Sequence, residues 1–533
     1  MRFNNSNSFR LSTYLLRKEK LQKHLTTILN LNSNEVKQIF YLNKNILTFP
    51  RHRIINSCMI FQKYNVNVKP LKDLQYSFML GNCCLEHRIN VLKDIGVSNL
   101  DVSLITRVPH LLRKQLSTFK EITKIPAEQS ITRNIFSRLG NEIPNKLSEL
   151  ESKDKLTAKQ YYQACLLHCK TEVFELPYLD DRILLRSYKL WKSVSMIAET
   201  LKILRTDLGY DEKMIKKHAF VITASADNIR LLLNSFDDIC GVPIVTFLKN
   251  YPYLLFQDAN NIKQLLVTLK RYEIPNEQIK KYNKILKIDN ETFIERMEMI
   301  KRHSDLYIWL KHPRILDIIL HTNMTKDRID FLHIVNRVKW ARPHTILSKK
   351  INLEKFLQNN ISIISTKKAL KYVFSKELGT DHVDLINILA RHKHWKTVGF
   401  VEIDQMLKYL KQHFTISEIC QNIHIVLYAQ SRVEEVLADL KQQYSNSTEH
   451  SFTNNQYLAL CLYMLEKDNH FTDDGIWSGR YNAQQQSLDP LSLKRSLKGI
   501  NDDTSISDID DVSIEDSDSI CNNLIDDSTP SSI

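Results

Sequence analysis

Glycine is scarce in this 533-residue chain, which contains only ten. That is about 2% of the residues, whereas proteins average about 7%. The ten glycines are scattered, and no group of them forms the glycine-rich loop that cradles phosphates in nucleotide-binding folds. The sequence therefore argues against dinucleotide-binding and P-loop folds.

Metal-site and catalytic signatures are also missing. The nine cysteines lack a metal-site spacing, because Cys165 and Cys169 lie four residues apart and no matching second pair follows. We expect free thiols in a reducing compartment, with no metal and no cofactor. No Gly-x-Ser-x-Gly, His-Glu-x-x-His or paired-carboxylate motif is present, so we expect no enzyme. No stretch approaches 18 continuous apolar residues, so no membrane span is expected.

Positive charge is absent from the C-terminal end of the chain. Residues 501–533 contain no Lys or Arg, and the remaining residues hold all 74 Lys and Arg against 50 Asp and Glu, a net charge of +24. A body this positive indicates a polyanionic partner, with nucleic acid ahead of acidic membranes. The alternative is a basic surface kept for solubility. Segment 501–533 carries ten carboxylates, on Asp502, Asp503, Asp508, Asp510, Asp511, Glu515, Asp516, Asp518, Asp526 and Asp527.

Composition shifts at both ends of the chain. The first 18 residues contain four basic residues and no acid, which predicts a mitochondrial transit peptide over 1–25; a disordered basic arm is the alternative. Residues 480–533 are low-complexity and acidic, and we expect them to be disordered because they cannot bury enough apolar surface. This tail could occupy a basic groove as a mimic of nucleic acid, or recruit a protein partner.

One sequence motif recurs from Arg205 to Leu316. It consists of a turn, an apolar helix, a proline or its substitute, and then more leucines. If Pro252 and Pro313 mark one point, and His218 and Asn283 replace proline, the copies recur at a nearly constant interval that is typical of stacked repeats. We expect Pro109 to break a helix in an earlier copy and His424 to hold the proline point in a terminal one. The pattern predicts an all-α solenoid over 26–475, most regular over 205–335.

These repeats resemble the mitochondrial transcription termination factor (mTERF) family. The resemblance covers roughly residues 30–440 and is carried by Gly96-Val97 with Pro109–Leu112, by Gly241-Val242 with Tyr251–Leu255, and by His312–Leu316. It implies a superhelical solenoid of short mTERF-type helical repeats, curved into a half-doughnut whose basic concave face holds duplex nucleic acid.

Basic residues recur beside the proline point, which would place them on one face of a solenoid. Such a stripe would follow phosphates without reading sequence, although lysines also occur on the surface of every helix. The stripe comprises Arg107, Lys216, Lys217, Lys249, Lys280, Lys281, Lys311 and Arg314.

Several arginines and one aromatic cluster are further candidates for nucleic-acid contacts. A guanidinium can bond a guanine edge bidentately, which makes Arg314, Arg328, Arg337 and Arg342 candidate base readers. The run from Arg391 through Lys393 to Lys396 surrounds Trp395, as a stacking or phosphate site would. Trp309 and Trp340 fit core packing better than stacking.

The resemblance implies a mitochondrial matrix protein that binds duplex DNA, has proteins of the transcription machinery as candidate partners, and regulates transcription by termination or at initiation. Two alternatives stay open. One is binding of ribosomal RNA during mitochondrial ribosome assembly, and the other is a HEAT-like scaffold that binds proteins.

Overall fold

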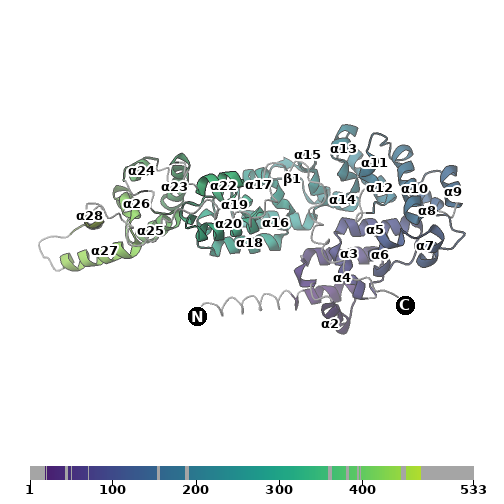
Figure 1. Ribbon diagram of the computed structural model, residues 1–533, viewed down its shortest axis with the longest axis horizontal. Helices are drawn as coiled ribbons and strands as arrows, with labels where there is room; N and C mark the ends of the chain where they lie inside the picture. Colours follow the sequence, from purple (N-terminus) through teal and green to yellow (C-terminus); the bar gives the residue numbers. More distant parts are fainter. Residues whose placement is uncertain are drawn as a thin grey trace. The chain divides into compact units, whose positions relative to one another are not determined.

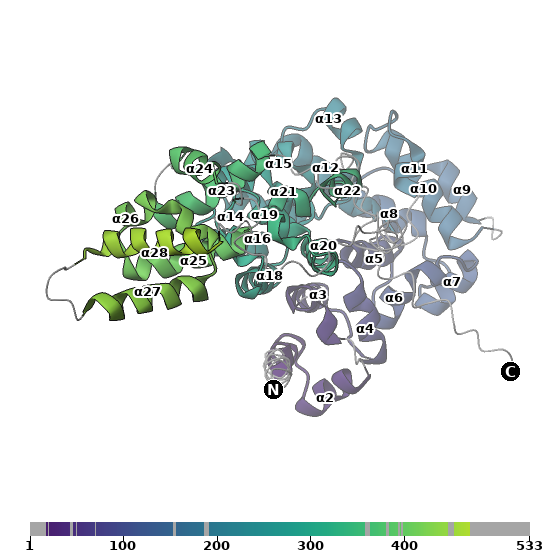
Figure 2. The same cartoon turned by 60° about the vertical axis from the view of Figure 1, so that its left-hand side comes forward.

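The computed structural model describes residues 18–19, 21–42, 46–49, 51–69, 71–152, 156–185, 191–357, 363–379, 383–392, 395, 398–445 and 452–469. Over these residues the regular structure is helical apart from one small hairpin (Figures 1 and 2). The predicted all-α repeat fold is therefore confirmed, while the half-doughnut curvature stays a prediction. The chain divides into two compact units, unit 1 up to residue 276 and unit 2 from residue 277, which we describe separately. The predicted tail, 480–533, lies outside the described residues.

Unit 1 contains a succession of short α-helices and 3₁₀ helices (η). Its elements are α2 Ser33–Leu42, η1 Ile46–Thr48, α3 Arg51–Lys63, η2 Leu71–Asp73, α4 Leu74–Met79, α5 Asn82–Ile95, α6 Val102–Leu111, α7 Leu116–Thr123, α8 Ile131–Leu139, α9 Asn145–Ser152, α10 Ala158–Glu172, α11 Asp181–Leu185, α12 Val194–Thr206, α13 Glu212–Lys217, η3 Ala219–Thr223, α14 Ala226–Ser235, β1 Asp238–Ile239, β2 Val242–Pro243, α15 Ile244–Asn250, η4 Pro252–Phe256 and α16 Ala259–Arg271.

Unit 2 continues the same alternation of elements. It contains α17 Asn276–Lys281, which starts at the unit boundary, η5 Asn283–Lys287, α18 Asn290–Arg302, η6 Tyr307–Trp309, α19 Ile315–Leu320, α20 Thr322–Ile334, η7 Val338–Trp340, α21 Pro343–Ile346, α22 Lys350–Leu357, α23 Ile363–Leu378, α24 Val383–Leu389, α25 Phe400–His413, α26 Ile416–Gln421, η8 Ile423–Leu427, α27 Gln430–Ser445 and α28 Asn454–Asn469.

The repeat is a long helix, a short helix of six or seven residues, and a 3₁₀ helix of five. This order is seen in α12–α13–η3 and α14–α15–η4 of unit 1 and in α25–α26–η8 of unit 2. The 3₁₀ helix carries the apolar pair of the sequence motif, since Leu254, Leu255, Ile285 and Leu286 are each 0% exposed. Burying one such side chain contributes about 1.5–3 kcal/mol, so the 3₁₀ segments anchor the repeat to its neighbours.

The residue before each of these 3₁₀ helices holds one backbone conformation. The values of φ and ψ are −120° and 49° at His218, −129° and 67° at Tyr251, −112° and 46° at Tyr282, and −116° and 37° at Asn422. This conformation ends the short helix and redirects the chain. The next residue is Pro252 in one copy, where the missing amide costs no helical hydrogen bond because first-turn amides have no intrahelical partner.

The proline-point prediction holds in part. Pro252 and Asn283 both begin a 3₁₀ helix, as predicted. The equivalent of Pro252 is Ala219 and not His218, which precedes the helix, and His424 is the second residue of η8. Pro313 follows η6 and precedes α19, so that copy departs from the pattern.

Pro109 does not break a helix, contrary to the prediction. It lies inside α6, which continues to Leu111. Proline in a helix removes one hydrogen bond, and here that bond falls in the last turn of α6, where the helix ends two residues later. The missing hydrogen bond therefore affects only the C-terminal turn of α6.

Two predicted glycine turns are confirmed. Gly96 ends α5 in the left-handed region, with φ of 110°, and a Cβ there would lie 2.1 Å from Nδ2 of Asn134. Cys240 and Gly241 connect β1 to β2 with φ of 56° and 78°, as a type I′ hairpin turn requires. Glycine is placed where the backbone demands it.

The N-terminal helical stretch packs against the body of unit 1. Residues 21–29 are helical, and Leu21 and Leu25 are 2% and 0% exposed. His24 contacts the Arg51 guanidinium on α3. The predicted transit peptide, 1–25, thus overlaps packed residues at its C-terminal end, and residues 1–17 lie outside the described residues.

The buried carboxyl group of Asp94 in unit 1 is bonded by residues of neighbouring helices. Asp94 on α5 accepts hydrogen bonds from the Ser193 and Ser195 hydroxyls at 2.7 and 2.6 Å, and it pairs with Arg138 at 3.1 Å. Burial raises the pKa of Asp94 although Arg138 stabilises its charge. Since Ser193 and Ser195 lie at the start of α12, the Asp94 carboxylate is held at the N-terminus of this helix, where the helix dipole favours an anion.

Candidate nucleic-acid interface

Lysines end the short helices of unit 1, as the sequence predicts. Lys216 and Lys217 are exposed in the last turn of α13, and Lys249 lies in the last turn of α15. The two repeats adjoin, because η3 packs against η4. A Cβ at Gly209 would lie 3.4 Å from Lys249 Nζ, so this side chain reaches back toward the α12–α13 turn. A cation at a helix C-terminus also interacts favourably with the helix dipole, which is a structural explanation for the same placement.

Partly exposed rings accompany these lysines. His218 and Tyr251 follow the short helices directly, and Phe220 lies between the rings of His218 and Phe256 at centroid distances of 6.2 and 5.9 Å. Tyr253 lies 6.4 Å from Tyr251. Aromatic faces beside cations suit contacts with nucleotides, and the same rings also pack the repeats together.

Unit 2 brings together four of its basic side chains. Lys281 ends α17, Lys284 lies in η5, Arg314 precedes α19 and Arg342 precedes α21. The elements pack in succession, with η5 against α19, α19 against α20, and α20 against α21. We call these four residues and His344 of α21 the unit 2 basic cluster.

The pKa shifts of His344 and Asp317 agree with the packing of these elements. Burial and the charges of Arg314 and Arg342 lower the pKa of His344. Burial raises the pKa of Asp317, while His321, Arg314 and Lys281 act in the opposite direction. Asp317 Oδ1 lies 3.8 Å from His321 Nε2. Lys281, Lys284, Arg314 and Arg342 form no ion pair with any described residue. The cluster therefore holds an excess of positive charge.

Arg328 has a structural role that conflicts with its prediction as a base reader. Arg328 is 7% exposed, and its Nη1 donates hydrogen bonds to the carbonyl oxygens of Ile346 and Ser348 at 2.6 and 2.5 Å. These bonds tie α20 to the end of α21. The guanidinium is committed to backbone carbonyls and cannot engage a base without breaking them.

Four other predicted residues are not members of the cluster. Arg107 is exposed on α6, which packs against α4 and α5 and lies apart from α13 in Figures 1 and 2. Lys280 pairs with Glu277 at 2.5 Å. Arg337 is half-buried before η7. Lys311 is exposed and lies in the segment that precedes α19.

The predicted stacking site at residues 391–396 is not supported. Trp395 is 6% exposed and His392 is 8% exposed, so the indole is a core ring. Arg391 is exposed after α24, and Lys393 lies outside the described residues. Trp309 and Trp340 are 0% and 9% exposed, which confirms their predicted place in the core.

The sequence reasoning missed Lys284 and His344. Lys284 follows Lys281 by only three residues, and this closeness in the sequence was a usable signal. His344 lies two residues after Arg342, but only the packing of α21 on α20 brings it near Arg314.

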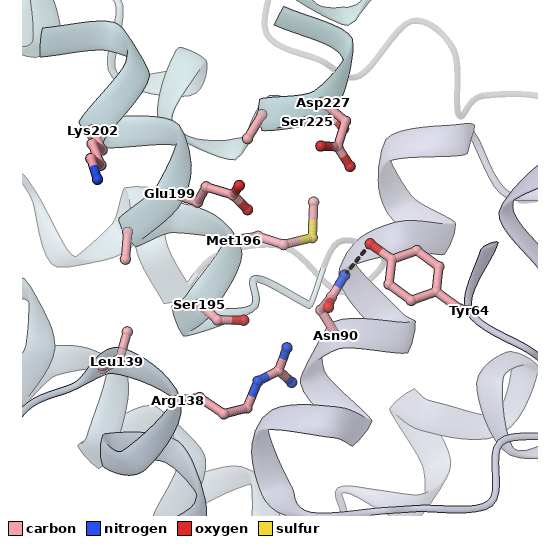
Figure 3. Close-up of a pocket in the computed structure, with 12 residues that line it drawn as sticks. Tyr64, Asn90, Arg138, Leu139, Ser195, Met196, Glu199, Lys202, Ser225 and Asp227 are labelled. Carbon is pink, nitrogen blue, oxygen red and sulfur yellow. Dashed lines mark hydrogen bonds between the residues drawn. The ribbon is translucent and has the colours of Figure 1, made fainter. Parts of the chain in front are cut away.

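A cavity of about 410 Å³ opens between α5, α8, α12 and α14 of unit 1 (Figure 3). The side chains of Glu199, Met196 and Arg138 point into it, and Asn90 Nδ2 donates to the Tyr64 hydroxyl at 3.0 Å. Three of its charged groups are already paired, Arg138 with Asp94 and both Glu199 and Asp227 with Arg230. The cavity is a polar cleft braced by ion pairs.

The described residues contain neither a candidate metal site nor a candidate membrane span. No three His, Cys, Asp or Glu side chains there are grouped so as to hold a metal ion. None of the helices in the same part of the chain has the length and apolar character needed to cross a membrane.

Comparison with known proteins identifies a relative over most of the chain. Transcription termination factor 5, mitochondrial, of Drosophila melanogaster is 25% identical over 447 residues, which cover 79% of this chain and 78% of that protein. Small ribosomal subunit protein uS2 of Mannheimia succiniciproducens is 30% identical over only 112 residues, 20% of this chain and 44% of that protein. No protein-family model and no solved structure matches. The chain is therefore similar over most of its length to a mitochondrial transcription termination factor, and its helical repeats agree with that similarity.

Proposed function

We propose that this protein acts in the mitochondrial matrix, where it binds duplex DNA through the basic ends of its repeats and regulates transcription by termination or at initiation. The observation that carries the proposal is the unit 2 basic cluster, whose lysines and arginines have no ion-pair partner among the described residues. The similarity to a mitochondrial transcription termination factor supports the compartment and the process. The predicted transit peptide supports the same compartment.

The chemistry of the cluster suits a phosphate backbone. Duplex DNA carries one negative charge for about every 1.7 Å of helix axis, and cations that neutralise phosphates release condensed counterions. Lys281, Lys284, Arg314 and Arg342 lie in or beside four different elements, so each can engage a different phosphate. Contacts of this type position a protein on the duplex and carry no sequence information.

Salt dependence of binding tests the proposal. The affinity of the purified full-length protein for a fluorescent DNA duplex is measured by anisotropy between 50 and 200 mM salt. If six to ten phosphates are engaged, the affinity falls about 10³–10⁵-fold over this range. Weak binding that is independent of salt would contradict the proposal and favour the HEAT-like scaffold.

A competition measurement addresses the ribosomal-RNA alternative. Unlabelled duplex DNA and structured ribosomal RNA of equal length are titrated against the labelled duplex complex. We expect duplex DNA to compete at the lower concentration. If RNA displaces the labelled duplex at a lower concentration than DNA does, the result would favour ribosomal RNA as the ligand and contradict the DNA proposal.

A further inference from the structure

The acidic segment 501–533 has no role in the nucleic-acid binding proposed above. Its ten carboxylates are not offset by any Lys or Arg, so the segment carries ten negative charges. Five of them fall between Asp502 and Asp511, and three between Glu515 and Asp518. Closely spaced carboxylates attract the same cations as a phosphate backbone, although at lower charge density.

The unit 2 basic cluster offers the matching positive charge. Lys281 and Lys284 lie at the junction of α17 and η5, and Arg314 and Arg342 lie at the starts of α19 and α21. Asp317 lies close enough to Arg314 and Lys281 for their charges to lower its pKa, against the effect of burial. A single half-buried carboxyl does not balance four cations, so the cluster retains the capacity to bind an anion.

The covalent connection makes such an encounter frequent. The described part of unit 2 ends with α28 at Asn469, and the acidic segment begins after Asn501. If the connecting stretch is as disordered as its composition predicts, its root-mean-square span is about 30 Å and its maximum is about 100 Å. Tethering at this length gives an effective concentration of about 1 mM. Even a weak carboxylate contact is then populated.

We propose that the carboxylates of segment 502–527 dock on the unit 2 basic cluster and compete there with nucleic acid. The inference rests on the proposed function, because the cluster is the same surface. A duplex displaces the segment because its charges are denser and it spans more of the repeats. With an intrinsic dissociation constant of about 0.1 mM, a tethered ligand at about 1 mM weakens duplex binding about tenfold.

Zero-length cross-linking tests docking without nucleic acid. Carbodiimide treatment of the full-length protein, followed by peptide mass spectrometry, should join Lys281 or Lys284 to carboxylates of 502–527. Added duplex should suppress these products. Segment cross-links that are found only at lysines outside the cluster would overturn the inference, whether or not the protein binds DNA.

Duplex affinity tests the competition. Three variants are compared with the wild type: deletion of 501–533, replacement of its ten acids by Asn and Gln, and a scrambled segment of unchanged composition. We expect the first two to bind duplex about tenfold more tightly and the scrambled one to match the wild type. Equal affinity in all four proteins would refute competition. Failure of all four to bind would instead refute the proposed function, while the cross-links would still report docking.

Discussion

Tyr251 and Tyr282 adopt the same backbone conformation in successive copies of the repeat, each directly before a 3₁₀ helix that carries a fully buried apolar pair. The residue after Tyr251 is Pro252, and the residue after Tyr282 is Asn283. Each tyrosine amide donates to the carbonyl four residues earlier, Tyr251 to Phe247 and Tyr282 to Gln278, at 2.9 Å. The repeat is thus defined by a conformation and a hydrogen bond, and proline is one of several residues that fit it.

Proline scanning at residues 282 and 283 tests this register. Asn283→Pro should change the free energy of unfolding by less than about 1 kcal/mol, because Pro252 already occupies the equivalent position. Tyr282→Pro should cost about 3 kcal/mol or more, because it removes the amide that donates to Gln278. Urea denaturation followed by circular dichroism gives both values. Similar costs at the two positions would show that the repeats are wrongly aligned.

Arg328 should matter for stability and not for recognition. Arg328→Gln removes the charged donor to the Ile346 and Ser348 carbonyls and should destabilise unit 2 by about 2–3 kcal/mol. Duplex affinity, measured at a temperature where the variant is folded, should stay within twofold of the wild type. Selective loss of affinity for one DNA sequence without loss of stability would restore its role as a base reader.

Glu151 should make unit 1 sensitive to acid. The carboxylate is 9% exposed and accepts hydrogen bonds from the amides of Ile131 and Thr132 at the start of α8, at 2.7 and 3.1 Å. Burial alone would raise the pKa of Glu151, but bonds from the Thr132 hydroxyl and these amides outweigh it and lower the pKa to about 2.

The sign of the pH dependence follows from that lowered pKa. A carboxyl that binds its proton less tightly when folded adds stability above its ordinary pKa of 4.5, and the gain is lost as pH falls toward 2. Glu151→Gln should therefore cost about 2 kcal/mol at pH 7 and progressively less below pH 4.5. Thermal melts at pH 7, 5 and 3.5 measure the difference. A constant difference across this range would contradict the assignment.

The mature N-terminus should lie before Leu21. Leu21 and Leu25 are buried, and removal of both would uncover apolar partners in unit 1 at a cost of about 1.5–3 kcal/mol for each side chain. N-terminal sequencing of the protein isolated from mitochondria locates the cleavage site. A mature chain that starts after Leu25 would contradict the packing argument.

The repeated elements could be predicted from the sequence, because they leave local patterns. Contacts between residues that lie far apart in the chain could not be predicted. Pro252 and the pair Leu254-Leu255 were recognisable because proline at a helix start and adjacent leucines leave a local signature. Ala219 was missed by one residue, since the conformation before a 3₁₀ helix is shared by His, Tyr and Asn and has no residue code. The structural role of Arg328 was not predictable, because the carbonyls to which it donates lie 18 and 20 residues away in the chain.

The candidate interface was predictable to a similar extent. Lys216, Lys217 and Lys249 recur at one point of the repeat, and the structure places them at the ends of equivalent short helices. The meeting of Lys281, Arg314 and Arg342 in one cluster depends on how η5, α19, α20 and α21 stack, which no local pattern encodes.

The central claim is that the unit 2 basic cluster binds phosphates, and a charge-matched pair of variants tests it most directly. Lys281→Gln with Lys284→Gln removes two cations from the cluster, and Lys441→Gln with Lys467→Gln removes two from the exposed faces of α27 and α28. The measurement is the slope of log affinity against log salt concentration for duplex binding. The account predicts that the slope falls by about 1.8 in magnitude for the cluster variant, at about 0.9 for each phosphate, and stays unchanged for the control. Equal slopes in the two variants would contradict it.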